Sequence, residues 1–519
     1  MQSRSRIHYP RHLVWLRVGA CATLISLLGC RPQSTEPKSN PTASAPGAPD
    51  ETWEVYYLQG AKIGYGKTVV QTVNRAGQAL VQTESDSHLK LERYAQPIEQ
   101  QVTLETLETS AGQLLEFRTE VTFGPTPVTF SGHVEGDAMV VQTNTQGAQQ
   151  VTRIPWSADV GGFRGAEQSL EKAPLKPGEK RSLRMLVPLV NQVAEVDLTA
   201  ADYETTRLLD DEARLLRIET SARLPDGNVM AETLWTDEQG AVLKRRIGGI
   251  NQESYRTTER IAKATAPSGQ PTLDVGFATT VHVDPPLKRA HQSREIRYRV
   301  ELPMGDPLTA FATGSTQSLR AVSPHVAELT VRSLRPGETT KSDAPAPIES
   351  IGTEYLEANS VLQIDDSRIK AMAAEARGDE TDPVKTALAL ERYVHDTMAP
   401  SDFTQAFATA AEVALSRSGD CTEHAVLLAA LARACAIPSR VAIGLVYVER
   451  SAGFGYHMWT EVYVDGQWLP LDATIGQRGI GAAHLKLVDS SLKGATAYSA
   501  FLPVSKVVGQ LKINVIEAR

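Results

Sequence analysis

The stretch Gly419-Asp420-Cys421-Thr422-Glu423-His424-Ala425 decides how the C-terminal part of this chain folds. Asp420 fits the N-cap of a helix, Glu423 completes a capping box three residues later, and Pro438 ends the segment. The helix places Cys421 at its first position, where free backbone amides and the positive end of the dipole favour a thiolate. Its buried face follows the three-and-four spacing of Ala425, Leu428, Ala429, Ala432 and Cys435.

Cys421 needs a partner if it is to act as a nucleophile. Asp420 and Glu423 place two carboxylates beside the thiol, and their charge opposes the effect of the helix end. We therefore expect the helix end alone to be insufficient and an imidazole to be required.

A β-hairpin further along supplies both an imidazole and a carboxylate. The run HMWTEVYV (457–464) meets Asp465-Gly466, a strong signal for a two-residue hairpin loop, and continues as QWLPLD (467–472). That loop makes Tyr463 face Trp468 and Trp459 face Asp472. His457 and Asp472 then share a sheet face as diagonal neighbours, with Cβ atoms about 7 Å apart. The carboxylate can accept the imidazole N–H and fix its tautomer.

Each of these residues also has a plain structural interpretation. A lone buried cysteine is usually a small core residue, and Cys435 fits that description. A histidine that opens a strand is more often structural than catalytic, and an aspartate after a strand is more often a turn former. The combination of a thiol at a helix start with a paired His457 and Asp472 favours a catalytic set.

Four blocks resemble the core of the transglutaminase-like superfamily in order and spacing: GDCTEHA (419–425), ACAIPSRV (434–441), HMWTEVYV (457–464) and WLPLDAT (468–474). The resemblance implies a papain-like α+β fold in which Cys421 is the nucleophile, His457 the general base and Asp472 its orienter. Trp459 and Arg440 match family positions next to the site, where structural and catalytic roles both stay open.

The resemblance does not identify the reaction, because relatives cross-link proteins, hydrolyse amides or do neither. We expect thiol-mediated acyl transfer or amide and peptide hydrolysis through a thioester. Hydrolysis is favoured over cross-linking because water is always available and no amine site is marked. The competing interpretation is a non-catalytic envelope protein that binds or scaffolds through its β units.

The N-terminus predicts a lipid anchor. Four arginines precede an apolar stretch from Val18 to Leu28, and Leu27-Leu28-Gly29-Cys30 resembles the lipobox of bacterial lipoprotein precursors. We expect a signal peptide at 1–29, lipidation of Cys30 and a Pro/Ser-rich tether at 30–50. The predicted location is a secreted, membrane-anchored one, at the periplasmic or outer-membrane face.

Charge argues against a nucleic-acid partner. The 519 residues carry 53 basic and 61 acidic side chains, a formal net charge of −8. Loss of residues 1–29 removes four arginines and no acid, which makes the net charge −12. An acidic chain repels phosphate backbones, so no nucleic-acid partner is expected. The transglutaminase-like resemblance implies a protein or peptide substrate, and the predicted location suggests one in the cell envelope.

The middle of the chain reads as antiparallel β structure, with short alternating runs between Gly, Pro, Asp and Asn turns. Glu105–Thr109 and Glu232–Thr236 begin similar segments, which suggests two related units at 51–160 and 161–265. A further β segment is expected at 280–342. The predicted fold is therefore multidomain, with N-terminal all-β units followed by the α+β domain at 350–519.

Three further expectations concern the C-terminal domain. Residues 371–398 read as helical and should pack beneath the site, and Gly509–Val515 should return to the catalytic sheet as a strand. The Pro-rich stretch near 345 suggests a hinge, so a chain that begins near Ile348 is expected to fold without the β region.

No metal or cofactor is predicted. Cys421, His424 and Cys435 lack a second paired ligand motif, and Cys421 and Cys435 lie too far apart along one helix for a disulfide. Gly66-Lys67-Thr68 ends like a phosphate-binding loop, but strand patterns on both sides make it a turn.

Overall fold

The computed structural model describes residues 49–122, 127–145, 148–265, 273–336, 351–400, 408–493 and 497–519. The predicted signal peptide, Cys30, nearly all of the tether and the Pro-rich stretch near 345 lie outside these residues.

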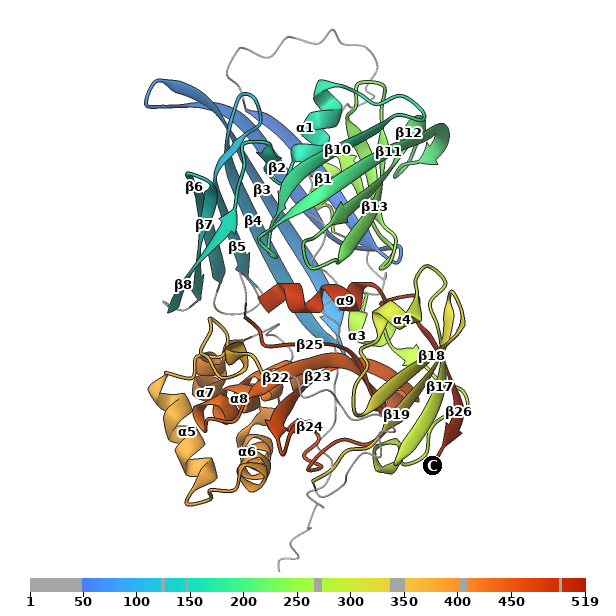
Figure 1. Ribbon diagram of the computed structural model, residues 1–519. Helices are drawn as coiled ribbons and strands as arrows, with labels where there is room; N and C mark the ends of the chain where they lie inside the picture. The colour runs from blue at the N-terminus through green and yellow to red at the C-terminus, as the bar shows by residue number, and fades with distance from the viewer. Residues whose placement is uncertain are drawn as a thin grey trace, which may run out of the picture.

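The N-terminal half is one large sheet in the order β8-β7-β6-β5-β4-β3-β2-β1-β15-β14-β13-β12-β11-β10-β9. Figure 1 shows it as the upper half of the molecule, with the long strands β3 and β4 running down toward the lower half. The strands are β1 (Asp50–Leu58), β2 (Ala61–Arg75), β3 (Gln78–Arg93), β4 (Gln96–Thr109), β5 (Leu114–Thr122), β6 (Val128–Glu135), β7 (Ala138–Thr145), β8 (Ala148–Pro155), β9 (Val160–Gly161), β10 (Lys180–Val187), β11 (Gln192–Arg207), β12 (Glu212–Arg223), β13 (Val229–Thr236), β14 (Val242–Ile247) and β15 (Gln252–Thr257).

Alternation of side chains gives this sheet its buried face. In β4, Val102 and Leu104 are buried, whereas Thr103 and Glu105, which alternate with them, are only partly covered. The two similar sequence segments lie in β4 and β13, and each leads through a turn into the next strand, β5 or β14. Because β1 pairs with both β2 and β15, the segments 51–160 and 161–265 contribute to a single sheet.

The C-terminal α+β region has a mixed layer structure. Its sheet runs β16-β23-β22-β25, with β24 beside β23. Helix α8 packs on β23 and β22, and α5, α6 and α7 pack around α8. The elements are β16 (Val281–His282), α5 (Ser367–Arg377), α6 (Pro383–Thr397), α7 (Ala410–Ser416), α8 (Cys421–Ala434), β22 (Ser439–Val448), β23 (Gly453–Val464), β24 (Gln467–Leu471) and β25 (His484–Ser490). The helical stretch expected at 371–398 is two helices, because Gly378 at φ +56° ends the first and Asp382 caps the second.

A small four-stranded sheet stands beside the α+β region, in the order β18-β19-β17-β26. The expectation that Gly509–Val515 returns to the catalytic sheet is wrong, since β26 pairs with β17 instead. Tyr298 of β17 ties the two sheets together: its hydroxyl donates to the Ala482 carbonyl at 2.9 Å and its ring packs on Phe454. The strands are β17 (Glu295–Glu301), β18 (Gln317–Ser323), β19 (Val326–Arg332) and β26 (Lys512–Ala518).

The upper sheet and the lower half share one hydrophobic core. A continuous cluster of buried side chains includes Leu91 of β3, Val300 of β17, Leu427 of α8 and Val462 of β23. Two separate clusters of buried hydrophobic side chains come mainly from the upper sheet. Short helices α3 (Val275–Ala278) and α9 (Leu502–Ser505) lie where the halves meet (Figure 1).

The fold class predicted from the sequence is confirmed: a large antiparallel β region precedes an α+β region.

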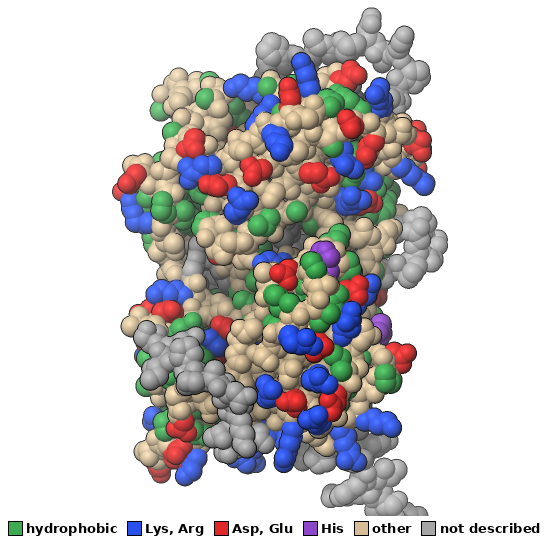
Figure 2. All heavy atoms as spheres, turned by 45° about the vertical axis from the view of Figure 1, so that its right-hand side comes forward, with side chains coloured by type: hydrophobic (Ala, Val, Ile, Leu, Met, Phe, Trp, Pro, Cys, Tyr) green, Lys and Arg blue, Asp and Glu red, His purple; other side chains and the backbone are tan. Residues whose placement is uncertain are grey.

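Figure 2 shows acidic and basic side chains interspersed over one face, so neither sign of charge dominates that face. Within the described ranges, no helix combines the length and the apolar character that crossing a membrane requires.

Candidate active site

Helix α8 begins where the sequence predicts and places Cys421 at its first position. The Asp420 carboxylate accepts the Thr422 N–H at 2.8 Å, and the Glu423 carboxylate accepts the Asp420 N–H at 2.9 Å. These bonds satisfy amides that the first helical turn leaves without partners. The predicted capping box is confirmed, and Cys421 is a free, buried cysteine.

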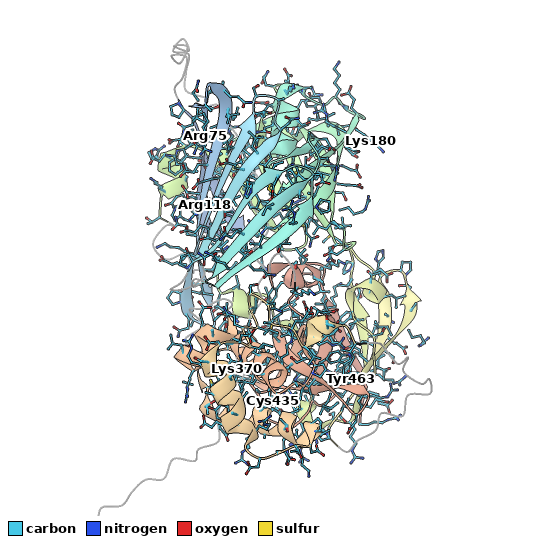
Figure 3. The ribbon with its side chains drawn as sticks, turned by 60° about the vertical axis from the view of Figure 1, so that its left-hand side comes forward. Arg75, Arg118, Lys180, Lys370, Cys435 and Tyr463 are labelled. Carbon is cyan, nitrogen blue, oxygen red and sulfur yellow. The ribbon has the colours of Figure 1, made fainter. Side chains whose placement is uncertain are left out.

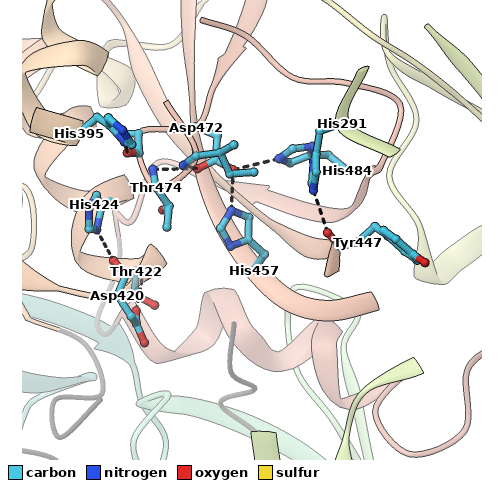
Figure 4. A network of polar contacts seen from close by, with 12 residues as sticks. His291, His395, Asp420, Thr422, His424, Tyr447, His457, Asp472, Thr474 and His484 are labelled. Carbon is cyan, nitrogen blue, oxygen red and sulfur yellow. Dashed lines mark hydrogen bonds and ion pairs between the residues drawn. The ribbon is translucent and has the colours of Figure 1, made fainter. Parts of the chain in front are cut away.

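The hairpin has the predicted register. Val464 pairs with Gln467 and Tyr463 with Trp468. The imidazole Nε2 of His457 donates to the Asp472 carboxylate at 2.7 Å, and both side chains are buried. Figure 4 shows this contact as the centre of a polar network. The pairing of His457 with Asp472 inferred from strand geometry is therefore confirmed.

The charge state of His457 follows from its neighbours. Burial alone would lower its pKa, but the charges of Asp472 and Cys421, with the hydrogen bond to Asp472, raise the pKa of His457 to about 10. Burial would raise the pKa of Asp472. The charge of His457 and the hydrogen bonds from His457 and His484 outweigh burial and hold that pKa well below its ordinary value. Nδ1 of His457 takes no part in the contact with Asp472, so it is the nitrogen available to the thiol.

A second histidine, His484 on β25, was not found from the sequence. Its Nε2 donates to the same Asp472 oxygen at 2.9 Å (Figure 4). Burial lowers the pKa of His484, which favours its neutral form. The other Asp472 oxygen accepts the backbone N–H groups of Thr474 and Ile475. Both carboxylate oxygens are thus used, which fixes the orientation of Asp472.

The loop after Asp472 is held by helix α6. The His395 imidazole bonds to the Ala473 carbonyl at 2.9 Å, and the Glu391 carboxylate accepts the Arg478 N–H at 3.2 Å. Burial and the nearby Asp472 charge raise the pKa of Glu391 to about 8. These contacts position the carboxylate that in turn orients His457.

The two site-adjacent residues differ in their surroundings. The Trp459 ring lies next to His457, with ring centroids 6.2 Å apart, and also packs against His484. Arg440 joins an ion network instead: it contacts Glu461 at 2.8 Å and Asp489 at 2.9 Å, and it stacks over the Trp468 ring. These contacts support a structural role for Arg440 in the sheet.

One residue of the upper sheet also reaches this site. Arg93, the last residue of β3, forms an ion pair with Asp420, directly before Cys421. No spacing in the sequence relates these two positions, which are 327 residues apart.

Among the described residues, His457, Asp472 and His484 bring three potential metal ligands close together. Cys421 and Cys435 stand at opposite ends of α8, so they cannot share an ion with His424. The ligand atoms of His457, Asp472 and His484 lie within 4.8 Å of one another. Both of these imidazoles already donate to one carboxylate oxygen, so we assign the group to hydrogen bonding.

Comparison with known families identifies this part of the chain. Residues 370–473 match the family model of the transglutaminase-like superfamily, so the chain contains a transglutaminase-like domain. The matched range holds Cys421, His457 and Asp472 and ends before His484. No curated protein matches the chain.

Solved structures show limited similarity. A proposed cysteine protease from Cytophaga hutchinsonii is 15% identical, with a TM-score of 0.29, over 43% of this chain and 86% of that one. A β-barrel-like protein of a domain of unknown function from Brucella abortus is 10% identical, with a TM-score of 0.30, over 40% of this chain and 96% of that one. At these values the similarity carries no functional conclusion.

Proposed function

We propose that this protein is a thiol-dependent hydrolase or acyltransferase in which Cys421 is the nucleophile, His457 the proton carrier and Asp472 its orienter. One observation carries the proposal: buried His457 bonds buried Asp472 through Nε2 at 2.7 Å. The charges of Asp472 and Cys421 are among the causes that raise the pKa of His457. A thiol, an imidazole and a carboxylate in this sequence of contacts form an activated nucleophile.

The first chemical step forms a thioester. The Cys421 thiolate sulfur bonds to the carbonyl carbon of an amide, and the carbon–nitrogen bond breaks as protonated His457 gives its proton to the leaving amine. The backbone N–H of Cys421, at the first helical position, has no intrahelical acceptor and can stabilise the oxyanion.

The second step releases the acyl group. Water attacks the thioester carbon, His457 takes a proton from that water, and the carbon–sulfur bond breaks to restore the thiolate. An amine in place of water would give cross-linking. We favour hydrolysis of peptide or amide bonds because water is always available as the acceptor.

Selective alkylation tests the proposal. With limiting iodoacetamide near neutral pH, peptide mass spectrometry should find Cys421 modified at least about tenfold faster than Cys435. Exposure alone predicts the opposite order, because Cys421 is only 2% exposed and Cys435 is half-buried. Burial also raises the pKa of the Cys435 thiol. Faster labelling of Cys435 would argue against an activated Cys421.

We also propose that the protein is a cell-envelope lipoprotein anchored through Cys30. The support is the Leu-Leu-Gly-Cys run at 27–30 behind a basic segment. Cys30→Ser should leave unprocessed precursor or release soluble protein in membrane fractionation. A mature N-terminus elsewhere, without acyl mass on Cys30, would contradict the proposal.

A further inference from the structure

The tip of the β3–β4 hairpin belongs to the upper sheet but docks onto the catalytic half. Its two-residue loop is Tyr94-Ala95, and both residues have positive φ, at 51° and 63°. Such turns normally use Asn and Gly, because other side chains are strained there. Asp274 compensates by accepting the N–H groups of Tyr94 and Ala95 at 2.9 and 2.6 Å.

Further contacts fix this tip in place. The N–H of Glu92 donates to the Leu273 carbonyl at 3.0 Å. The Tyr94 ring packs edge-on against Phe277, with centroids 5.2 Å apart, and a side chain at Gly276 would collide with it. These partners hold the hairpin tip in a defined position next to the start of α8.

Arg93 reaches from this tip to the residue before the nucleophile. Its guanidinium Nη2 lies 2.5 Å from Asp420 Oδ2, and the two side chains are only 8% and 2% exposed. Tyr94 lies close by: burial raises its pKa, and among the charges that raise it further is that of Cys421. The upper sheet thus contributes a buried cation that pairs with the residue directly before Cys421.

Charges on several elements surround Cys421. Its own helix contributes Asp420, Glu423 and His424, strand β23 contributes His457 with Asp472 behind it, and the hairpin tip contributes Arg93 and Tyr94. Burial and the Asp420 charge raise the pKa of Glu423, which favours its neutral form. Burial acts to raise the pKa of Asp420, but the Arg93 charge and hydrogen bonds from α8 outweigh it and lower that pKa. An ionised Asp420 beside the thiol opposes a thiolate unless a cation balances it.

We propose that Arg93 is a positioning residue of the active site: its guanidinium balances the Asp420 carboxylate beside Cys421, so that the upper sheet sets the reactivity of the nucleophile. This inference rests on the proposed function, because it concerns Cys421 reacting as a thiolate. With this role for Arg93, the upper sheet takes part in catalysis, whereas a pure binding module would not affect the reactivity of Cys421.

The pH dependence of Cys421 alkylation in the full chain tests the charge balance. Arg93→Gln removes the cation and should move the pH midpoint of labelling upward by about one unit. Asp420→Asn keeps a good N-cap and should move the midpoint downward. The double variant Arg93→Gln/Asp420→Asn removes one charge of each sign and should return the midpoint close to that of the wild type. Arg93→Lys keeps the charge and should keep the midpoint.

Lys90→Gln is the matched control. Lys90 lies on the same hairpin and pairs with Glu99, but both side chains are well exposed, at 73% and 70%. Its loss should leave the midpoint unchanged. If Arg93→Gln proves unfolded by thermal melting, Asp420→Asn alone still gives the test, and a midpoint equal to that of the wild type would overturn the inference.

The outcomes separate this inference from the proposed function. A wild-type Cys421 that labels no faster than Cys435 defeats the proposed function. A reactive wild-type Cys421 whose midpoint does not move in Arg93→Gln overturns only the role of Arg93. A rate change that is uniform at every pH would mean that the hairpin affects access to the thiol, and it too would overturn the charge balance.

Discussion

Cys421→Ala should abolish turnover of amide substrates while leaving the fold intact. Alanine keeps the helix start, because the capping bonds of Asp420 and Glu423 do not use the thiol. Without the sulfur no thioester can form, so activity should fall to the uncatalysed background. The measurement is release of amine or of new peptide ends from a mixed peptide library, with the melting temperature as the check on folding.

Asp472→Asn should lower turnover on the order of 10²- to 10⁴-fold. One carboxylate oxygen accepts from His457 and His484, and the other accepts from the Thr474 and Ile475 amides. An asparagine has one acceptor oxygen, so its NH₂ group must face N–H donors on one side or the other. The imidazole of His457 then loses its orientation or its tautomer.

Cys435→Ala is the matched control for these variants. Cys435 stands at the other end of α8, and Figure 3 shows it in the lower half with Lys370 of α5. Its loss should leave turnover near that of the wild type. Cys421 would lose its assigned role if Cys421→Ala kept full activity. The same conclusion would follow if Cys435→Ala lost activity while Cys421→Ala kept it.

A chain shortened to begin at Ile348 should be insoluble or unfolded. This replaces the expectation from the sequence that such a chain folds alone. It would lack β17, so β26 would lose the only neighbour that it has among the described strands. Removal of β16, Tyr298 and the hairpin tip would also expose the shared core around α8. Unpaired strand edges and exposed apolar surface both favour aggregation.

Expression of the shortened chain beside the full chain of 519 residues tests this. Solubility, circular dichroism and Cys421 alkylation are the measurements, and the full chain is the control for each. A shortened chain that melts cooperatively and still labels Cys421 ahead of Cys435 would mean that the catalytic domain is independent of the upper sheet.

The local parts of the site could be predicted because short sequence patterns encode them. The capping box around Cys421 depends on residues three apart, and the hairpin register depends on Asp465-Gly466 and strand alternation. Both are contacts between near neighbours, for which chain geometry leaves few alternatives. The pairing of His457 with Asp472 followed from that register without any view of the whole fold.

The long-range parts could not be predicted. His484 reaches Asp472 because β25 pairs with β22, and strand order in a sheet is not written in any local pattern. The pairing of β26 with β17 could not be predicted for the same reason, because the alternating residues of β26 suit either sheet. No sequence pattern singles out Arg93, and its link to Asp420 exists only because two distant segments pack together.

The sequence by itself determined the fold class, the helix that presents Cys421, and the hairpin that joins His457 to Asp472. Each follows from hydrogen bonds and side-chain spacing within a few residues. Only the tertiary structure decided that a second histidine shares Asp472, and that the upper sheet places a cation on Asp420, next to Cys421. These contacts depend on burial of one common core, whose free energy is a property of the whole chain and not of any segment.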